Sequence, residues 1–397
     1  MEGNIKDDKY ELIIWKNGKR ADSCFKIVIP KNISSIQTLK EYILSSNHLS
    51  NIMQPEKIRL FNQKGLELEE LDLPYLPENP LIYISFNNKQ FSNMNYHNQY
   101  KILQPINKGG FAQVFLGENV LTHKLVAIKK TDIKNFSTDE LYNLSREGRL
   151  ISNLVHPNII KINCFYTNDN YLYNVMEYAK GGELTQLINS KKPIPESQIK
   201  NIFKQIHSAV NYLHNRNIIH RDLKPNNIVF LDEEKTNVAI IDFGISSNVS
   251  GGDVLKAGTL KYLPPEAFLV GDFKNSTEID MWAMGIILYL LNFKCFPFDG
   301  KTSSEIKNKI FFEQVSYPKN IKIRKSLINL IDNLLNKDYK KRITCADESF
   351  AQYFNDNNMN KDAFICTKVL KSKSTKTASL KVKQVKILLE KIQNNIK

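Results

Sequence analysis

HRDLKPNN at positions 220–227, read together with DFG at 242–244, is the stretch that decides the fold of this chain. It carries a carboxylate, an ammonium and an amide at short fixed spacing in Asp222, Lys224 and Asn227, and Asp242 adds a second carboxylate. Transfer of a phosphoryl group needs a proton acceptor, a cation for the moving charge and oxygen ligands for Mg²⁺. The two motifs therefore predict a phosphotransfer site, whereas an isolated His-Arg-Asp triplet would more often be a polar turn.

Further motifs upstream give this stretch its context. Residues 100–106 read as a strand that runs into NKGGFAQV at 107–114, a turn with Gly109 and Gly110 at its tip. VAIK at 126–129 is an apolar strand that ends in lysine. SxxE at 137–140 reads as a capping box that opens a helix carrying Glu147, and HPNI follows at 156–159.

Together these motifs resemble those of the eukaryotic serine/threonine protein kinases. The resemblance covers about residues 100–354 and extends to GTLKYLPPE at 258–266, DxWxxG at 280–285 and KKRI at 340–343. It implies an α+β fold with two lobes, a small β-rich lobe and a large helical lobe, which bind ATP and Mg²⁺ between them. Lys224 followed by Pro225 is typical of the serine/threonine members rather than the tyrosine members.

The resemblance also implies the roles of the catalytic residues. Asp222 would orient and deprotonate the substrate hydroxyl, and Lys224 would neutralise the moving phosphoryl group. Asn227 and Asp242 would ligate Mg²⁺.

The nucleotide site that the resemblance implies draws residues from the glycine-containing turn at 107–114, from the strand 126–129, from the segment 172–184, and from positions 229 and 242. Lys129 would pair with the ATP phosphates, and Glu147 would hold Lys129 in place, although an ordinary surface glutamate is the alternative for Glu147. Adenine needs an apolar slot and one edge of backbone donor and acceptor. The complete set is Asn107, Lys108, Gly109, Gly110, Phe111, Ala112, Val114, Ala127, Lys129, Met176, Glu177, Ala179, Glu183, Val229 and Asp242.

Other motif residues are expected to support the site rather than perform chemistry. Asp280 would brace the backbone of the catalytic loop, and Glu266 would form a buried ion pair with Arg342. Thr259 would bridge Asp222 and Lys224.

The chain departs from the family pattern in the loop between residues 242 and 266. The position four residues before Thr259 is Leu255, and the hydroxyl residues between 244 and 258 are Ser246, Ser247 and Ser250. Arg221 usually accompanies a phosphate on this loop. We expect that activity does not require loop phosphorylation here, with Asp253 as a candidate for the negative charge.

Substrate selection departs from the pattern of the members directed by arginine. Glu183 is present, but Asn226 and Leu290 occupy positions that are acidic in those members. We therefore do not expect a strong requirement for arginine in the substrate.

Residues 1–88 form a separate unit. Strands at 10–15 and 25–29 flank an Asn-Gly turn, and a helix at 34–46 precedes strands at 57–61 and 81–85. This order resembles the ubiquitin-like β-grasp fold, with a doublecortin-type domain as an alternative. We expect a module that binds a protein partner, or else a small extension packed on its neighbour.

Polar residues 89–99 read as a linker between this unit and the kinase domain, 100–355. Residues 356–397 form a basic tail: from Lys361 onward there are ten lysines and two acids, a net charge of +8. Residues 380–396 have the period of an amphipathic helix, which suits an acidic partner or an anionic membrane, with a solvated terminal helix as the simpler alternative.

The formal net charge is +14, but because the tail holds +8 of it, the rest is only mildly basic and no nucleic-acid partner is expected. Five scattered cysteines without a Cys-x-x-Cys pair argue against a disulfide framework or a zinc module. The polar N-terminus is unlike a signal peptide, and the most apolar run, 281–291, is too short to span a bilayer. We expect a cytoplasmic protein, with the nucleus as an alternative.

A pseudokinase scaffold that acts through its ubiquitin-like unit and tail is the competing hypothesis. Degraded kinases typically lose at least one catalytic residue, and the five that distinguish the two cases are intact: Lys129, Glu147, Asp222, Asn227 and Asp242. The motifs at 220–227 and 258–266 disfavour a small-molecule or lipid kinase.

Overall fold

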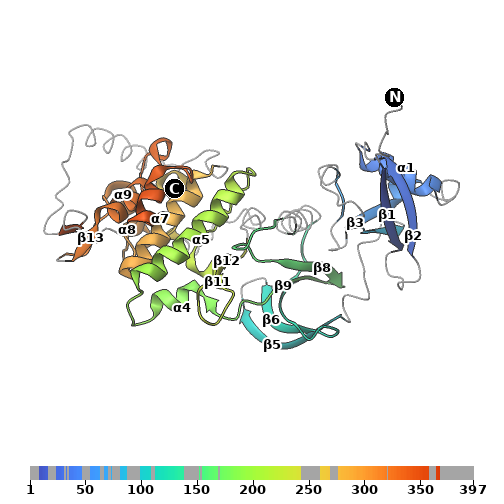
Figure 1. Ribbon diagram of the computed structural model, residues 1–397, viewed down its shortest axis with the longest axis horizontal. Helices are drawn as coiled ribbons and strands as arrows, with labels where there is room; N and C mark the ends of the chain where they lie inside the picture. Colours follow the sequence, from blue (N-terminus) through green and yellow to red (C-terminus); the bar gives the residue numbers. More distant parts are fainter. Residues whose placement is uncertain are drawn as a thin grey trace, which may run out of the picture. The chain divides into compact units, whose positions relative to one another are not determined.

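The computed structural model describes most of the chain in two compact units. The described residues are 9–16, 24–30, 33, 35–46, 54–62, 67–69, 73, 81–86, 99–108, 112–137, 152, 154–168, 170–242, 260–268, 276–319, 321–356 and 364–366. One unit comprises residues 1–179 with 245–250, and the other comprises 180–244 with 251–397. The helices and strands carry the labels of Figure 1.

The N-terminal sheet of the first unit has four strands in the order β2-β1-β4-β3. The central pair, β1 and β4, is parallel, and the two outer pairs are antiparallel. The elements lie where the sequence predicts them: β1 (Lys9–Lys16), β2 (Cys24–Pro30), α1 (Ile36–Ser46), β3 (Ile58–Asn62) and β4 (Leu81–Phe86). Ser35 Oγ accepts the backbone N–H of Thr38 at 3.0 Å and so caps α1.

The core of this sheet forms because alternate strand residues and one face of α1 are apolar. Ile14, Ile27, Leu60 and Ile84 from the strands cluster with Leu39 from the helix, and all five are buried.

The second sheet of the first unit has five antiparallel strands in the order β5-β6-β7-β9-β8. Its strands are β5 (Tyr100–Lys108), β6 (Ala112–Asn119), β7 (Leu125–Asp132), β8 (Ile162–Asn168) and β9 (Tyr171–Glu177). The strands are visibly curved in Figure 1. Tyr100 on one edge strand packs against the cluster that contains Cys164 on the other, so the sheet curls around a core that includes Ile128, Cys164 and Val175.

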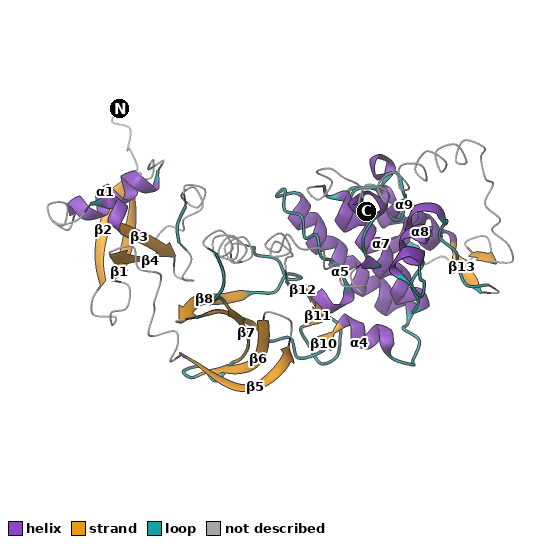
Figure 2. Cartoon of the chain, turned by 180° about the vertical axis from the view of Figure 1, so that it is seen from behind, coloured by secondary structure: helices purple, strands orange, loops and turns teal. Residues whose placement is uncertain are grey.

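The second unit is mainly helical, as the purple ribbons of Figure 2 show. Its helices are α4 (Leu184–Asn189), α5 (Glu196–His214), α7 (Glu278–Phe293), α8 (Ser303–Phe312), α9 (Lys325–Leu334) and α10 (Glu348–Asn355). Helix α7 is buried along nearly its whole length, with Trp282 at 0% exposure, so the run 281–291 is the core helix that the sequence predicts. None of the described helices is long and apolar enough to cross a membrane.

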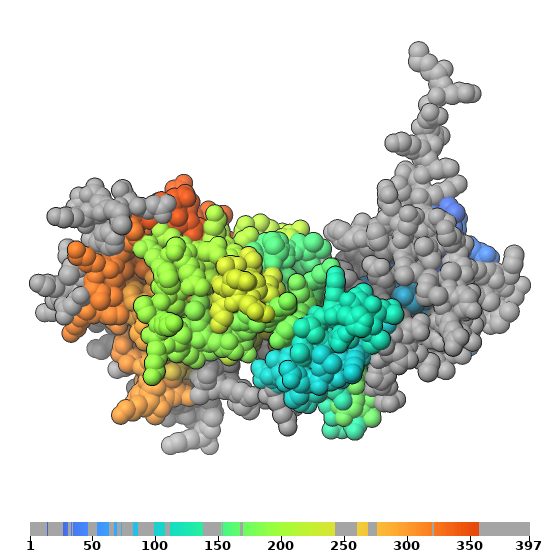
Figure 3. All heavy atoms as spheres, turned by 60° about the horizontal axis from the view of Figure 1, so that its bottom comes forward, coloured from blue at the N-terminus to red at the C-terminus, as the bar shows by residue number. Residues whose placement is uncertain are grey.

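A small sheet and three short turns of 3₁₀ helix complete the part of this unit that holds the site. The strands, in the order β10-β11-β12, are β10 (Gly182–Glu183), β11 (Ile228–Phe230) and β12 (Val238–Ile240). The 3₁₀ turns are η4 (Pro225–Asn227), η6 (Pro265–Phe268) and η8 (Tyr339–Lys341). In Figure 3, green and yellow residues from the stretch 180–242 form a continuous face of this unit.

A two-stranded sheet joins the start of the basic tail to the helical unit. Strand β14 (Phe364–Cys366) pairs antiparallel with β13 (Lys322–Arg324), which directly precedes α9. Arg324 in β13 also bonds to Glu196 at the start of α5, at 2.6 Å. No local pattern in the sequence of the tail predicts this strand.

Candidate functional site

The catalytic loop, residues 220–227, follows α5 and is held by a buried carboxylate on α7. Asp280 Oδ2 accepts the backbone N–H of His220 at 2.8 Å, and Oδ1 accepts that of Arg221 at 2.8 Å. His214 Nε2 donates to Asp280 Oδ2 at 2.9 Å. Asp280 and His220 have no exposed surface. The predicted bracing role of Asp280 is confirmed, and His214 is a supporting residue that the sequence analysis missed.

The His220 ring links the loop to the end of β12. Its Nε2 donates to the carbonyl oxygen of Ile241 at 3.1 Å, so Nδ1 is the atom that accepts the Asp222 N–H at 3.3 Å. Burial lowers the pKa of His220, which agrees with this neutral form. The ring therefore aligns two segments that carry predicted site residues, Asp222 and Asp242.

The three predicted catalytic side chains of the loop lie together. Lys224 Nζ contacts Asp222 Oδ1 at 2.8 Å and Oδ2 at 2.6 Å. Asn227 Nδ2 donates to the backbone oxygen of Asp222 at 2.8 Å and to Oδ2 at 2.9 Å. The Asp222 side chain is 26% exposed, so the carboxylate is both fixed by its neighbours and accessible to a substrate hydroxyl.

Asn227 and Asp242 fit a magnesium ion by their chemistry. Because both Asn227 side-chain contacts use Nδ2, the amide oxygen Oδ1 remains the atom that can face a cation. Asn227 directly precedes β11 and Asp242 follows β12, and the Ile241 N–H donates to the Asn227 backbone oxygen at 2.9 Å. Both residues thus lie at the same end of the hairpin and offer the oxygen ligands that Mg²⁺ prefers.

Glu183 and Val229 are brought to the same small sheet. They are paired in the register of β10 and β11. Asn226 Nδ2 also donates to Glu183 Oε2 at 3.1 Å. The catalytic loop is therefore bonded to Glu183 through a residue that sequence analysis treats only as a determinant of substrate choice.

In the first unit, four predicted nucleotide residues share one face of the five-stranded sheet. Val114 pairs with Lys129, and Ala127 pairs with Met176. Cross-strand partners project to the same side, and residues two apart in a strand do so as well. The opposite face of β7 carries Ile128, in the core.

The remaining predicted nucleotide residues lie at the ends of these strands or outside the described residues. Asn107 and Lys108 pair with Val114 and Gln113 where β5 and β6 meet, Ala112 begins β6, Glu177 ends β9, and Ala179 follows it. Gly109, Gly110, Phe111, Glu147, Asp253, Thr259, the linker from 89 to 98 and the tail from 367 onward are not among the described residues.

The predicted ion pair between Glu266 and Arg342 is confirmed. Arg342 donates to both carboxylate oxygens of Glu266, at 2.5 and 3.0 Å, and to the backbone oxygen of Asn336. Glu266 is 3% and Arg342 4% exposed. This pair fixes η6, at the end of the motif 258–266, which by the resemblance to protein kinases would be the substrate-binding loop.

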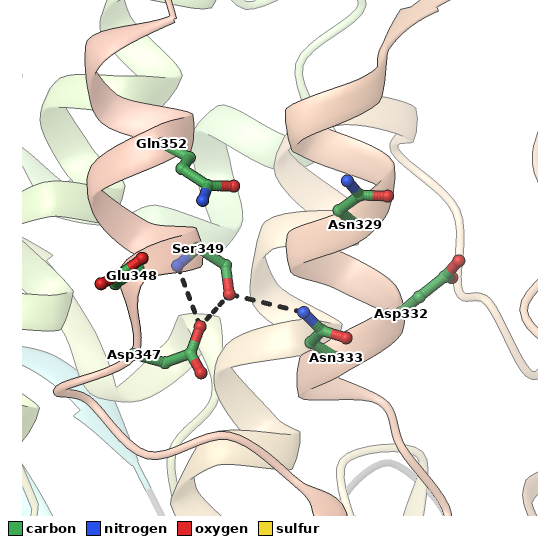
Figure 4. A pocket seen from close by; sticks show the side chains of 7 residues that line it. All are labelled: Asn329, Asp332, Asn333, Asp347, Glu348, Ser349 and Gln352. Carbon is green, nitrogen blue, oxygen red and sulfur yellow. Dashed lines mark hydrogen bonds between the residues drawn. The ribbon is translucent and has the colours of Figure 1, made fainter.

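A pocket of about 570 Å³ lies between α9 and α10, and none of the predicted site residues lines it (Figure 4). Asp347 caps α10 by accepting the Ser349 N–H at 2.9 Å, and Asp332 accepts the Tyr317 hydroxyl at 2.7 Å. Two of its three carboxylates thus stabilise the surrounding fold, and we assign the pocket no catalytic part.

Comparisons with known proteins agree with this geometry. The protein kinase domain family matches residues 100–354. Calcium-dependent protein kinase 6 of Plasmodium berghei (strain Anka) is 33% identical over 340 residues, which is 80% of this chain and 22% of that protein. Myosin light chain kinase A of Dictyostelium discoideum is 35% identical over 266 residues, 66% of this chain and 90% of that protein. Since the family match takes in more than half of the sequence, the chain belongs to the eukaryotic serine/threonine protein kinase family.

Proposed function

We propose that this chain is an active kinase that transfers the γ-phosphoryl group of ATP to serine or threonine hydroxyls of proteins. The observation that carries the proposal is that Lys224 and Asn227 each lie within hydrogen-bond distance of the Asp222 carboxylate. A pseudokinase has no need to hold an accessible carboxylate between a cation and a metal-binding amide.

Each member of this group has a distinct part in the reaction. Asp222 accepts the proton of the substrate hydroxyl, because its carboxylate is fixed and partly exposed. Lys224, 2.6 Å from that carboxylate, supplies positive charge for the phosphoryl group in transfer. Asn227 and Asp242 would hold Mg²⁺, which neutralises phosphate charge when bound.

Lys129 is proposed to pair with the ATP phosphates. Its place in β7, on the same face as Val114, Ala127 and Met176, supports this role. Glu147 is proposed as its carboxylate partner on the motif resemblance alone.

The test is a radiolabelled ATP assay on generic protein substrates with Mg²⁺, comparing the wild type with Asp222→Asn. We expect kcat to fall by about 10²–10⁴ when the base is lost. Glu233→Gln, an exposed change on the β11–β12 hairpin, is the matched control and should retain full activity. Equal phosphorylation by the wild type and Asp222→Asn would contradict the catalytic proposal and favour the hypothesis of a pseudokinase scaffold.

We further propose that residues 1–88 are a ubiquitin-like β-grasp module that binds a protein partner. The supporting observation is the order β2-β1-β4-β3 with its parallel central pair, and with α1 between β2 and β3 in the chain. A chain shortened to residues 89–397 should keep its activity on generic substrates. A large loss of that activity would instead indicate that residues 1–88 form part of the catalytic fold.

A further inference from the structure

The segment 260–268 includes the described part of the motif 258–266. Burial and then the negative charge of Asp222 raise the pKa of the Tyr262 hydroxyl in this segment. Leu260 is buried, and Lys261 stands between Leu260 and Tyr262. Lys261 is therefore held in the backbone between a buried residue and a residue whose pKa responds to the charge of Asp222.

Lys261 forms an ion pair with Asp299, in the connection between α7 and α8. Its Nζ contacts Asp299 Oδ1 at 2.6 Å and lies 4.5 Å from the centroid of the Phe296 ring. Tyr262 packs edge-on against the same ring at 5.5 Å. Asp299 also accepts the Gly300 N–H at 2.9 Å, and its hydrogen bond with Lys261 is the main cause of its lowered pKa. The pair is therefore well formed.

The two members of this pair differ in exposure. The Asp299 side chain is 55% exposed and the Lys261 side chain 23%. A carboxylate as exposed as that of Asp299 could attract a basic substrate residue if Lys261 did not neutralise it. Glu183, a second acidic residue bonded to the catalytic loop, accepts a hydrogen bond from Asn226.

We propose that Lys261 is a specificity-determining residue: it masks Asp299 and so removes a site that would otherwise select basic residues near the acceptor hydroxyl. This inference rests on the proposed function, because it takes segment 260–268 as the surface that faces the substrate. Asn226 and Leu290 indicate a weak preference for basic substrates because neither is acidic. Asp299 is acidic, and here Lys261 would neutralise it within the chain.

The experiment measures peptide binding by fluorescence polarisation, which does not depend on phosphotransfer. Two labelled peptides carry one threonine, flanked in one by lysines and in the other by alanines. In the wild type the two affinities should agree within about twofold. In Lys261→Met the lysine peptide should gain about threefold to fivefold relative to the alanine peptide at low salt, and lose this gain at high salt.

Three further variants separate masking from net charge and from misfolding. Lys301→Met removes a nearby exposed lysine and should leave the ratio unchanged. Lys261→Met with Asp299→Asn should abolish the gain, and Lys261→Arg should keep the wild-type ratio because it retains the ion pair. Thermal melting of each variant verifies that it is folded.

An unchanged ratio in Lys261→Met, an equal gain in Lys301→Met, or no binding of either peptide to any variant would overturn the inference. The proposed function stands or fails separately, on the assay with Asp222→Asn. Wild-type activity together with an unchanged ratio would therefore reject the masking role alone.

Discussion

The catalytic loop and the segment 260–268 both lie in the second unit outside its long helices, but they are fixed in different ways. The loop is held by Asp280, a fully buried carboxylate that accepts two backbone N–H groups and His214. The segment is held at its far end by the buried pair of Glu266 and Arg342, and at its near end by the exposed pair of Lys261 and Asp299.

This difference indicates which parts of the site can vary. A buried charge is stable only when several donors compensate for its lost hydration, so changing one partner leaves the others unsatisfied. An exposed pair contributes little to stability and can change with limited cost to the fold. The catalytic loop should therefore tolerate little change, whereas residue 261 can adjust substrate choice.

The largest expected effect is that of Asp280→Asn. The amide has one acceptor where the carboxylate has two, and its NH₂ group would face backbone N–H donors. We expect a loss of about 3–5 kcal/mol in the free energy of unfolding and a lower kcat in the folded fraction. Urea denaturation and the phosphotransfer assay measure the two effects.

Asp299→Asn is the matched control, because it makes the same chemical change in the exposed pair. It should cost less than about 1 kcal/mol. Similar losses of stability in both variants would contradict the contrast between the two carboxylates.

Arg342→Met should cause the next largest loss, in the free energy of unfolding. It leaves Glu266 buried without its bidentate partner, although the methionine keeps some apolar contact with Trp282, whose ring lies 5.1 Å from the guanidinium carbon. We expect a loss of about 3 kcal/mol, measured by urea denaturation. Lys341→Met, next in the sequence and 76% exposed at its side chain, should change stability by under about 0.5 kcal/mol.

A smaller, pH-dependent effect is expected from His220 in the catalytic loop. Its pKa is lowered in the folded protein from the ordinary value of 6.5, so the unfolded chain takes up a proton first as the pH falls. Stability should therefore decrease below about pH 6.5, by at most about 1.4 kcal/mol per pH unit from this group. Melting curves between pH 5 and 7.5 should show a weaker dependence in His220→Gln, and an unchanged slope would exclude His220 as its source.

The elements that could be located best from the sequence are those whose apolar residues repeat at a regular spacing over many consecutive positions. The apolar face of α5 includes Ile202, Phe203, Ile206 and Val210, and all four are buried as their helical spacing predicts. The grouping of Asp222, Lys224 and Asn227 was also predictable, because their short spacing leaves the backbone few ways to separate them.

Features that depend on distant pairings could not be predicted in the same way. Strand β14 has three residues, and its pairing with β13 joins positions about forty apart, so no periodic signal marks it. Lys261 is one of 55 basic residues, and Asp299 lies 38 positions further along the chain. Their contact follows from how the second unit folds, not from the local sequence.

The smallest expected effect is that of phosphatase treatment on activity. The described end of the loop, residues 260–266, is held by carboxylates of the chain itself, Asp299 and Glu266, which bond to Lys261 and Arg342. A phosphate is therefore not needed to fix this segment, in line with Leu255 in the usual phosphorylation position. Enzyme treated with a broad phosphatase should keep its kcat and its KM for protein substrate within about twofold. A variant with alanine at 246, 247 and 250 should behave in the same way, and a loss of more than tenfold in either case would show that a loop phosphate does what these ion pairs cannot.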